Sequence, residues 1–292
     1  MLSISHTTRY SYDRPVAFGP HRLLLRPRDG HDLRVLEAHL AISPPATLRW
    51  HFDTFGNSVA HAIFAEQSDS LEVRSDLLIK QYANKPALGQ HYRAQARLPF
   101  AYSDENRIDL APFLAMEFPH ESAALNDWLD AVFRDRPDDI LAFLRALSTA
   151  IRGACTYRRR EELGTQSAMT TALKKSGTCR DFAFLLMESA RLYGFAARFV
   201  TGYLHDGARA SEKLAGGGST HAWADIYVPG QGWIEFDPTN LIDNNLALIR
   251  VAVTRTPAQA TPISGTYERA GANFLGMNVV VAVREESGLE AG

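Results

Sequence analysis

The sequence predicts an α+β protein in which an all-β N-terminal domain precedes a mixed core. Three observations support this fold class. The first hundred residues form short β-leaning segments between turn residues, helical periodicity begins near residue 122, and a helix with a strand hairpin lies between residues 176 and 238. We expect the β-rich domain to span residues 1–110 and the core, with closing strands at its C-terminal end, to span residues 111–292.

Composition indicates an ordinary globular protein. The 292 residues are 46% hydrophobic and 22% charged, which is enough to build two domains. The formal net charge of -2 leaves no basic surface for nucleic acid or an anionic membrane, and no apolar run of about 18 residues predicts a spanning helix. The first residues lack a signal-peptide pattern, and two cysteines fit a reducing cytoplasm. We therefore expect a cytoplasmic protein without cofactor or metal.

The N-terminal segments alternate or run apolar as strands do, and prolines and glycines separate them. A small antiparallel sandwich is the economical arrangement, and we expect it to dock or shape a substrate. His39, His51 and His61 stand in different strands without ligand spacing, so we interpret them as structural or surface residues. The predicted strands are Leu2 to Tyr12, Arg22 to Arg26, Leu33 to Ile42, Thr47 to Asp53, Ser58 to Glu66 and Leu71 to Lys80.

Helical signals follow a proline-bearing linker from Asn84 to Pro119, in which we expect no long helix. Apolar spacing predicts helices over Ser122 to Phe133 and Pro137 to Ile151, and Thr165 to Lys175 should hold a turn and a short helix. Between them lies Arg158-Arg159-Arg160, which is either a solvated surface or a means of steering an acidic substrate.

Cys179 stands where a loop becomes an amphipathic helix. Thr178 is placed as N-cap and Asp181 lies three residues on, which is the pattern of a capping box. The first turn of a helix stabilises a thiolate, because its N–H groups are unpaired and the macrodipole is positive there. The structural alternative is that Cys179 is a small buried hydrophobe, as we expect for Cys155.

Two segments after this helix predict a hairpin, one from Ser219 to Val228 and one from Trp233 to Pro238. In an even register, with Trp223 opposite Asp237, the side chains of His221 and Asp237 lie on one face roughly 7 Å apart at the backbone. A slip of one residue would separate them. We predict the even register.

Cys179, His221 and Asp237 together supply the groups that thiol catalysis needs. An imidazole takes the proton of the thiol and later protonates a leaving amine, and a carboxylate fixes the ring tautomer. Each residue alone has a structural explanation, but their joint occurrence at a helix start and on two paired strands indicates an acyl-transfer site.

Three motifs resemble those of a known family: G-T-C-R-D-F-A, H-A-W-A-D-I-Y and G-W-I-E-F-D-P-T-N. They look like the core motifs of the transglutaminase-like superfamily, which belongs to the papain-like cysteine enzymes, and the rest resembles its bacterial members with a β-rich N-terminal domain. The resemblance covers roughly residues 150–245. It implies a papain-like core with Cys179 as nucleophile, His221 as base and Asp237 as orienting acid. It also implies acyl transfer from a peptide or protein amide to an amine or to water.

The rest of the site is less specified by the sequence. The N–H of Cys179 is one candidate for the oxyanion hole, and Gln166 is a second by residue type, because papain-like sites often use an upstream glutamine. Trp223 and Trp233 could line an acyl-donor groove, although a core position is the alternative for at least one of them.

Three other functions remain open. A zinc hydrolase could use Cys, His and Asp as ligands, but the spacing matches no common zinc motif. A catalytically inactive peptide- or protein-binding module could keep the same fold. Calcium-regulated crosslinking would need a carboxylate-rich loop, which the sequence lacks.

Overall fold

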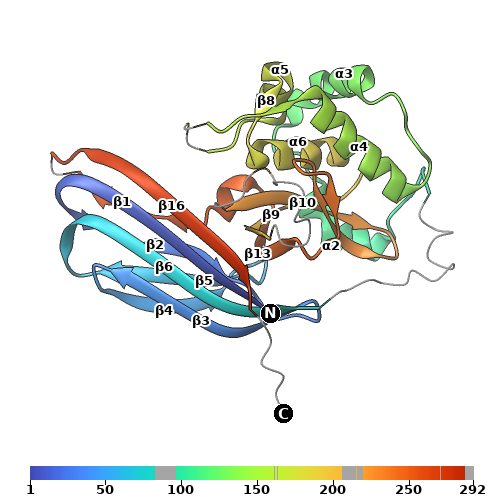
Figure 1. Cartoon of the computed structure of the whole chain (residues 1–292). Coiled ribbons are helices and arrows are strands. Elements are labelled where there is room, and N and C mark those ends of the chain that lie inside the picture. The colour runs from blue at the N-terminus through green and yellow to red at the C-terminus, as the bar shows by residue number, and fades with distance from the viewer. Residues whose placement is uncertain are drawn as a thin grey trace, which may run out of the picture.

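The structure of the chain is a computed structural model that describes residues 1–82, 97–160, 162, 164–205, 215, 220–269 and 271–286. A long β sandwich forms one end of the molecule, and a core of helices packed on a sheet forms the other (Figure 1). No helix in these ranges is both long and apolar enough to cross a membrane.

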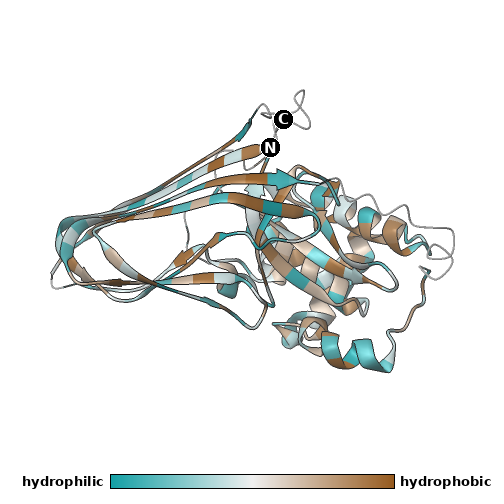
Figure 2. Ribbon diagram, turned by 90° about the horizontal axis from the view of Figure 1, so that it is seen from below, coloured by the Kyte–Doolittle hydropathy of each residue, from teal (hydrophilic) through white to brown (hydrophobic). Residues whose placement is uncertain are grey.

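Two antiparallel sheets make the sandwich. The first has the order β15-β1-β6-β3 with β16 also beside β1, and the second has the order β14-β2-β5-β4. All six strands expected in the N-terminal segment are present, some longer than predicted, with the bounds β1 Leu2–Phe18, β2 His21–Arg26, β3 Leu33–Ser43, β4 Ala46–Phe52, β5 Ser58–Phe64 and β6 Gln67–Gln81. Hydrophobic and hydrophilic residues alternate along these strands, because successive side chains point to opposite faces (Figure 2).

The C-terminal strands match our expectation of closing strands only in part, because Leu248–Thr254 pairs with the core sheet and the later strands pair with the sandwich. β16, Phe274–Glu285, runs antiparallel to β1 from the pair Leu2 and Glu285 onward, and so completes the sandwich. Two short strands, β14 Ile263–Ser264 and β15 Tyr267–Glu268, also pair with strands of the sandwich. The last part of the chain therefore returns to the N-terminal sheets, and it closes an edge that β1 would otherwise expose.

The helices of the core match the predictions in part. The one expected from Pro137 begins at Ile140, because the side chain of Asp139 accepts a hydrogen bond from the N–H of Ala142 at 2.8 Å and caps the helix there. The linker, whose residues 84–96 lie outside the described ranges, unexpectedly contains an 11-residue helix with Pro112 near its end. The helices are α2 Asp104–Leu114, α3 Ser122–Val132, α4 Ile140–Ala154, α5 Ala168–Lys174 and α6 Cys179–Leu192, with 3-10 turns at Pro119–Glu121 and Pro257–Ala260.

A five-stranded antiparallel sheet carries the core. Its order is β12-β11-β10-β9-β13, and α6 packs against β9 and β10. Phe182, Leu185 and Leu186 of α6 are fully buried together with Ala224 and Ile226 of β10. The strands are β9 Ala197–Leu204, β10 His221–Val228, β11 Gly232–Asp237, β12 Ile242–Asp243 and β13 Leu248–Thr254, and a separate parallel pair joins β7 Thr156–Tyr157 to β8 Ser176–Gly177.

The sandwich covers the free edge of this sheet at β13. The side-chain amide of Asn57 donates to the carbonyl of Val253 at 2.7 Å and accepts from its N–H at 2.9 Å, so it replaces a neighbouring strand. The side chain of Asp32 forms an ion pair with Arg250 at 2.9 Å. The two domains also share a buried apolar cluster that includes Tyr203 and Ile249, so apolar contacts help to hold the edge strand.

Candidate active site

Cys179 is the first residue of α6, as the sequence predicts. Thr178 is the N-cap, and the carboxylate of Asp181 accepts hydrogen bonds from its N–H at 2.8 Å and its hydroxyl at 2.9 Å. Gly177 comes immediately before this cap, and a Cβ there would lie 2.7 Å from the Cβ of Asp181. Only glycine fits, so the turn that presents Cys179 depends on both residues.

Asp181 also binds the loop that precedes α5. Its carboxylate forms a bidentate ion pair with Arg160, with distances of 2.8 and 2.7 Å, and accepts from the backbone N–H of Gln166 at 2.8 Å. Burial alone would raise the pKa of Asp181, but the bonds from Arg160 and from the N–H groups of Thr178 and Gln166 bring that pKa below its ordinary value. The acid is therefore ionised and holds the helix start and the loop together.

The hairpin of β10 and β11 has the predicted even register. Ala224 pairs with Phe236 and Asp225 with Glu235, and the same register sets Trp223 opposite Asp237. One face of β10 packs against α6 through small and aliphatic side chains. The predicted register is therefore confirmed, and His221 and Asp237 share a face.

His221 and Asp237 form a buried pair. Nε2 of His221 lies 2.8 Å from Oδ2 of Asp237, and both side chains are 0% exposed. Asp237 accepts two more hydrogen bonds, from the N–H of Thr239 at 2.8 Å and from Nδ2 of Asn240 at 2.9 Å. Burial raises the pKa of Asp237, but the charge of His221 and these hydrogen bonds lower it below its ordinary value.

The other nitrogen of His221, Nδ1, is buried and has no hydrogen-bond partner of ordinary geometry among the described residues. Cys179 is nevertheless a close neighbour. Burial lowers the pKa of His221, yet its interactions with Asp237 and then with Cys179 raise that pKa to about 10. The ring is therefore held by the acid through one nitrogen and open to the thiol through the other. Cys179 is a buried residue with 7% of its surface exposed.

Known proteins match the chain along most of its length. Residues 127–238 match the transglutaminase-like superfamily, and residues 2–80 match the bacterial transglutaminase-like N-terminal region. The chain belongs to the transglutaminase-like superfamily. An uncharacterized protein of Mycobacterium tuberculosis is 28% identical over 305 residues, covering 99% of this chain and 94% of its own, and one of Mycobacterium leprae is 25% identical over 97% and 98%.

A solved structure shares the fold of the whole transglutaminase-like chain. A protein from Cytophaga hutchinsonii, provisionally described as a cysteine protease, superposes with a TM-score of 0.73 at 20% identity, over 98% of this chain and 92% of that one. The similarity establishes a transglutaminase-like α+β core with a β-rich N-terminal region.

The remaining predicted site residues have mixed outcomes. Gln166 lies beside the start of the cysteine helix, but its side-chain amide donates to the carbonyl of Ser176 at 3.1 Å. Its role in an oxyanion hole stays a prediction. Trp223 is fully buried, and its ring stacks on His221 with 6.1 Å between centroids. Trp223 therefore takes the core position that was the alternative to lining a groove, and its ring packs against the imidazole.

Trp233 lies at the other end of the hairpin. It stands four residues from Asp237 along β11, roughly 13 Å away. Its ring packs against Phe113 of α2 and Tyr227 and beneath the guanidinium of Arg198, which is 4.2 Å from its centroid. Trp233 does not lie beside Cys179, because Phe113, Tyr227 and Arg198 hold its ring against α2.

Two residues of this region were not predicted from the sequence. Asn240 binds the carboxylate of Asp237, and its amide also joins Ala215 through hydrogen bonds of 2.9 and 3.3 Å. Its position three residues after Asp237 was the available signal. Tyr157 lies near Cys179 because the parallel pair of β7 and β8 places it beside Gly177, and no local pattern announces that pairing.

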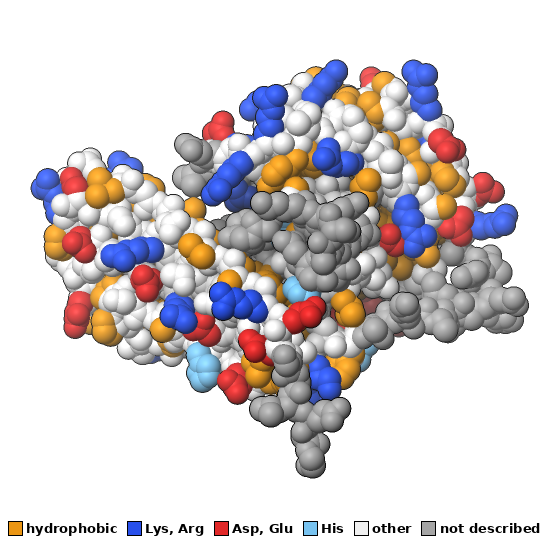
Figure 3. Space-filling model, viewed as in Figure 1, with side chains coloured by type: hydrophobic (Ala, Val, Ile, Leu, Met, Phe, Trp, Pro, Cys, Tyr) orange, Lys and Arg blue, Asp and Glu red, His pale blue; other side chains and the backbone are white. Residues whose placement is uncertain are grey.

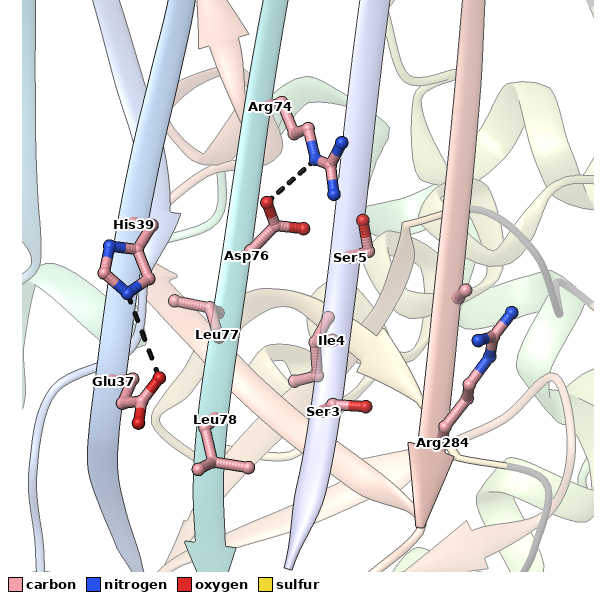
Figure 4. A pocket seen from close by; sticks show the side chains of 11 residues that line it. Ser3, Ile4, Ser5, Glu37, His39, Arg74, Asp76, Leu77, Leu78 and Arg284 are labelled. Carbon is pink, nitrogen blue, oxygen red and sulfur yellow. Dashed lines mark hydrogen bonds and ion pairs between the residues drawn. The ribbon is translucent and has the colours of Figure 1, made fainter. Parts of the chain in front are cut away.

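Other features of the described residues lie outside this site. Within the described ranges no three His, Cys, Asp or Glu side chains gather as a metal-binding group. A hollow of about 540 Å³ lies on the outer face of the first sandwich sheet, where Arg74 pairs with Asp76 and His39 with Glu37 (Figure 4). The hollow is formed by β1, β3, β6 and β16 of the sandwich, and no residue of α6 lines it.

Proposed function

We propose that the chain is a thiol-dependent amide hydrolase or acyltransferase in which Cys179, His221 and Asp237 act as nucleophile, base and orienting acid. The main support for this proposal is that only one of the two ring nitrogens of His221 has a hydrogen-bond partner of ordinary geometry among the described residues. His221 is bound through Nε2 to a buried carboxylate, while its Nδ1 has no hydrogen bond of ordinary geometry among the described residues and Cys179 is near enough to raise its pKa. An imidazole in that state can accept a thiol proton.

The chemistry balances through these groups. The proton of Cys179 moves to Nδ1 of His221, and the sulfur attacks the amide carbonyl carbon. As the tetrahedral intermediate collapses, the C–N bond breaks and the imidazolium returns its proton to the leaving amine or ammonia. Water or a second amine then gives a proton to His221 and attacks the thioester, which releases the thiolate. N–H groups at the start of α6 can stabilise the oxyanion.

The paired carboxylate has a defined part in this scheme. Asp237 stays ionised because its pKa is lowered, and it stabilises the positive charge that forms on the ring. Its hydrogen bonds from Thr239 and Asn240 keep its oxygens in place. The transglutaminase-like family and the related fold support the assignment at the level of acyl transfer from amides.

A peptide screen tests the proposal. Glutaminyl, isopeptide and backbone-amide donors would be incubated with the protein and read by mass spectrometry, with and without an added primary amine. Formation of an amine adduct indicates acyl transfer, and formation of the acid alone indicates hydrolysis. We expect Cys179→Ala to lose all turnover and all labelling by a thiol-directed amide analogue while keeping its unfolding midpoint.

Cys155→Ala is the matched control. Burial raises the pKa of Cys155 to about 11, so that thiol is protonated at neutral pH and should contribute nothing. Turnover or labelling that persists in Cys179→Ala and disappears in Cys155→Ala would reject the assignment. The cytoplasmic location expected from the sequence stays a prediction.

A further inference from the structure

Two arginine side chains near Cys179 have no ion-pair partner among the residues that the structure describes. Arg159 and Arg180 are exposed, and neither has an ion pair or a side-chain hydrogen bond within the described ranges. The next residue, Arg160, differs from them because it forms a bidentate ion pair with Asp181. Lys and Arg side chains gather on the surface around the α5 and β8 end of the core, where few acidic side chains are seen (Figure 3).

The backbone brings both arginines to the cysteine. β7 pairs in parallel with β8, with Tyr157 beside Gly177, and the N–H of Arg158 continues the pair by donating to the carbonyl of Gly177 at 2.9 Å. Side chains alternate along an extended chain, so Arg159 points to the same side as Tyr157 and Arg158 to the other. On the partner segment, Arg180 directly follows Cys179 in the first turn of α6.

The phenol of Tyr157 reports how close these groups are. Burial raises the pKa of Tyr157, the charges of Cys179 and Asp237 raise it further, and the charges of Arg159 and Arg180 lower it. These effects agree with the backbone pairing in placing Cys179, Arg159 and Arg180 around one phenol.

We propose that Arg159 and Arg180 form a carboxylate-binding rim around Cys179, and that the amide substrates carry an acidic group next to the bond that is broken. The planar guanidinium presents paired donors that match a carboxylate, and a free one beside a reactive thiol attracts anionic substrates. Neither Arg159 nor Arg180 forms an ion pair with the acids described nearby. Asp181 pairs with Arg160, Asp237 pairs with His221, and Glu162 also acts on Arg160. This inference rests on the proposed function for its substrate class.

A pair of alkylating reagents measures the rim without any turnover. Iodoacetate and iodoacetamide react identically: the sulfur forms a bond to the CH₂ carbon and iodide leaves. They differ only in charge, so the ratio of their rates at Cys179 cancels any change in thiol reactivity and reports the local potential. Digestion and mass spectrometry separate Cys179 from Cys155.

We expect Arg159→Gln and Arg180→Gln each to lower the iodoacetate to iodoacetamide ratio by about two- to threefold. A unit charge roughly 8 Å away in water-like surroundings has an effect of that size. The double variant should lose about fivefold, and added salt should compress all these differences. Arg158→Gln is the matched control, because its exposed side chain points away, and it should leave the ratio unchanged. The proposed rim would be overturned if the iodoacetate to iodoacetamide ratio were equal in the wild type and the double variant. It would also be overturned if the ratio fell as far in Arg158→Gln as in Arg159→Gln and Arg180→Gln.

A second experiment separates the rim from the proposed function. For the donor class found in the peptide screen, two peptides would differ only in Glu or Gln next to the donor amide. We expect the wild type to favour the Glu peptide in kcat/KM and the double variant to lose that preference. Equal use of both peptides by a wild type that still needs Cys179 would reject the acidic substrate while sparing the amide chemistry. An alkylation ratio that depends on the two arginines, in a protein that turns over no peptide, would support the rim and count against the proposed amide chemistry.

Discussion

Two buried carboxylates, Asp181 and Asp237, act on the candidate site in different ways. Both are close to 0% exposed, both have a lowered pKa, and each accepts several hydrogen bonds. Asp181 binds the side chain of Arg160 and the backbone N–H groups of Gln166 and Thr178, and these bonds fix the positions of all three residues. Asp237 binds an imidazole whose second nitrogen is left open.

The difference teaches how to separate a structural ion pair from a chemical one. A buried pair whose members are fully hydrogen-bonded contributes rigidity, and breaking it costs stability. A buried pair that leaves one polar atom without a hydrogen bond lowers the stability of the fold. When that atom lies beside a nucleophile, it is available to take part in a reaction. Asp181 is of the first kind and Asp237 of the second, so substitutions at the two should affect different properties.

The largest expected effect is on activity in Asp237→Asn. The amide cannot stabilise a positive imidazole, so kcat/KM should fall by roughly 10²- to 10⁴-fold with the fold retained. The measurement is turnover of the donor peptide together with an unfolding curve. In Asp181→Asn, assayed well below its midpoint, we expect less than about tenfold loss, because the group holds the backbone and no reacting atom. Equal losses in the two variants would remove the distinction.

Stability should respond in the opposite order. Asp181→Asn leaves Arg160 with no charged partner in a site where that side chain is only 13% exposed, and should cost about 3 kcal/mol of unfolding free energy in urea. The control is Asp243→Asn, which breaks the pair with Arg145, whose side chain is 55% exposed, and should cost less than about 1 kcal/mol. A loss in Asp181→Asn no greater than in the control would show that the carboxylate does not hold the loop.

The pH dependence of stability should single out the His221 pair. The pKa of His221 is raised to about 10 in the folded chain, above its ordinary value near 6.5. Its contribution is therefore fully present below about pH 6.5 and is lost as pH rises toward 10. Urea midpoints measured from pH 6 to 10 should fall in the wild type and fall less in His221→Gln. Parallel curves would contradict the raised pKa.

The smallest expected effect is that of Asn240→Ala. Its amide supplies one of three hydrogen bonds to Asp237, so its loss should lower kcat/KM by at most about tenfold and leave stability within about 1 kcal/mol. Asn126→Ala is the control, because that amide binds the exposed Asp130 at 3.3 Å on the surface of α3. A loss as large as that in Asp237→Asn would mean that Asn240, and not the carboxylate alone, holds the imidazole.

The accuracy of the sequence predictions varied with the range of the interactions. α3 spans Ser122–Val132 and so ends within one residue of the predicted helix, because apolar residues at helical spacing determine it locally. The start of α4 was misplaced by three residues, since Asp139 caps the helix more effectively than Pro137 begins it. The position of Trp233 could not be predicted, because Arg198 and α2 decide it from distant parts of the chain.

The amino-acid order alone determined that Cys179 begins a helix and that His221 and Asp237 face the same way, because capping and the two-residue period of a strand act between near neighbours. Only tertiary structure decided that β16 joins β1, and that Tyr157 lies beside the segment that leads into Cys179. Those contacts depend on how distant segments meet. Nothing in the residues next to each one specifies its partner.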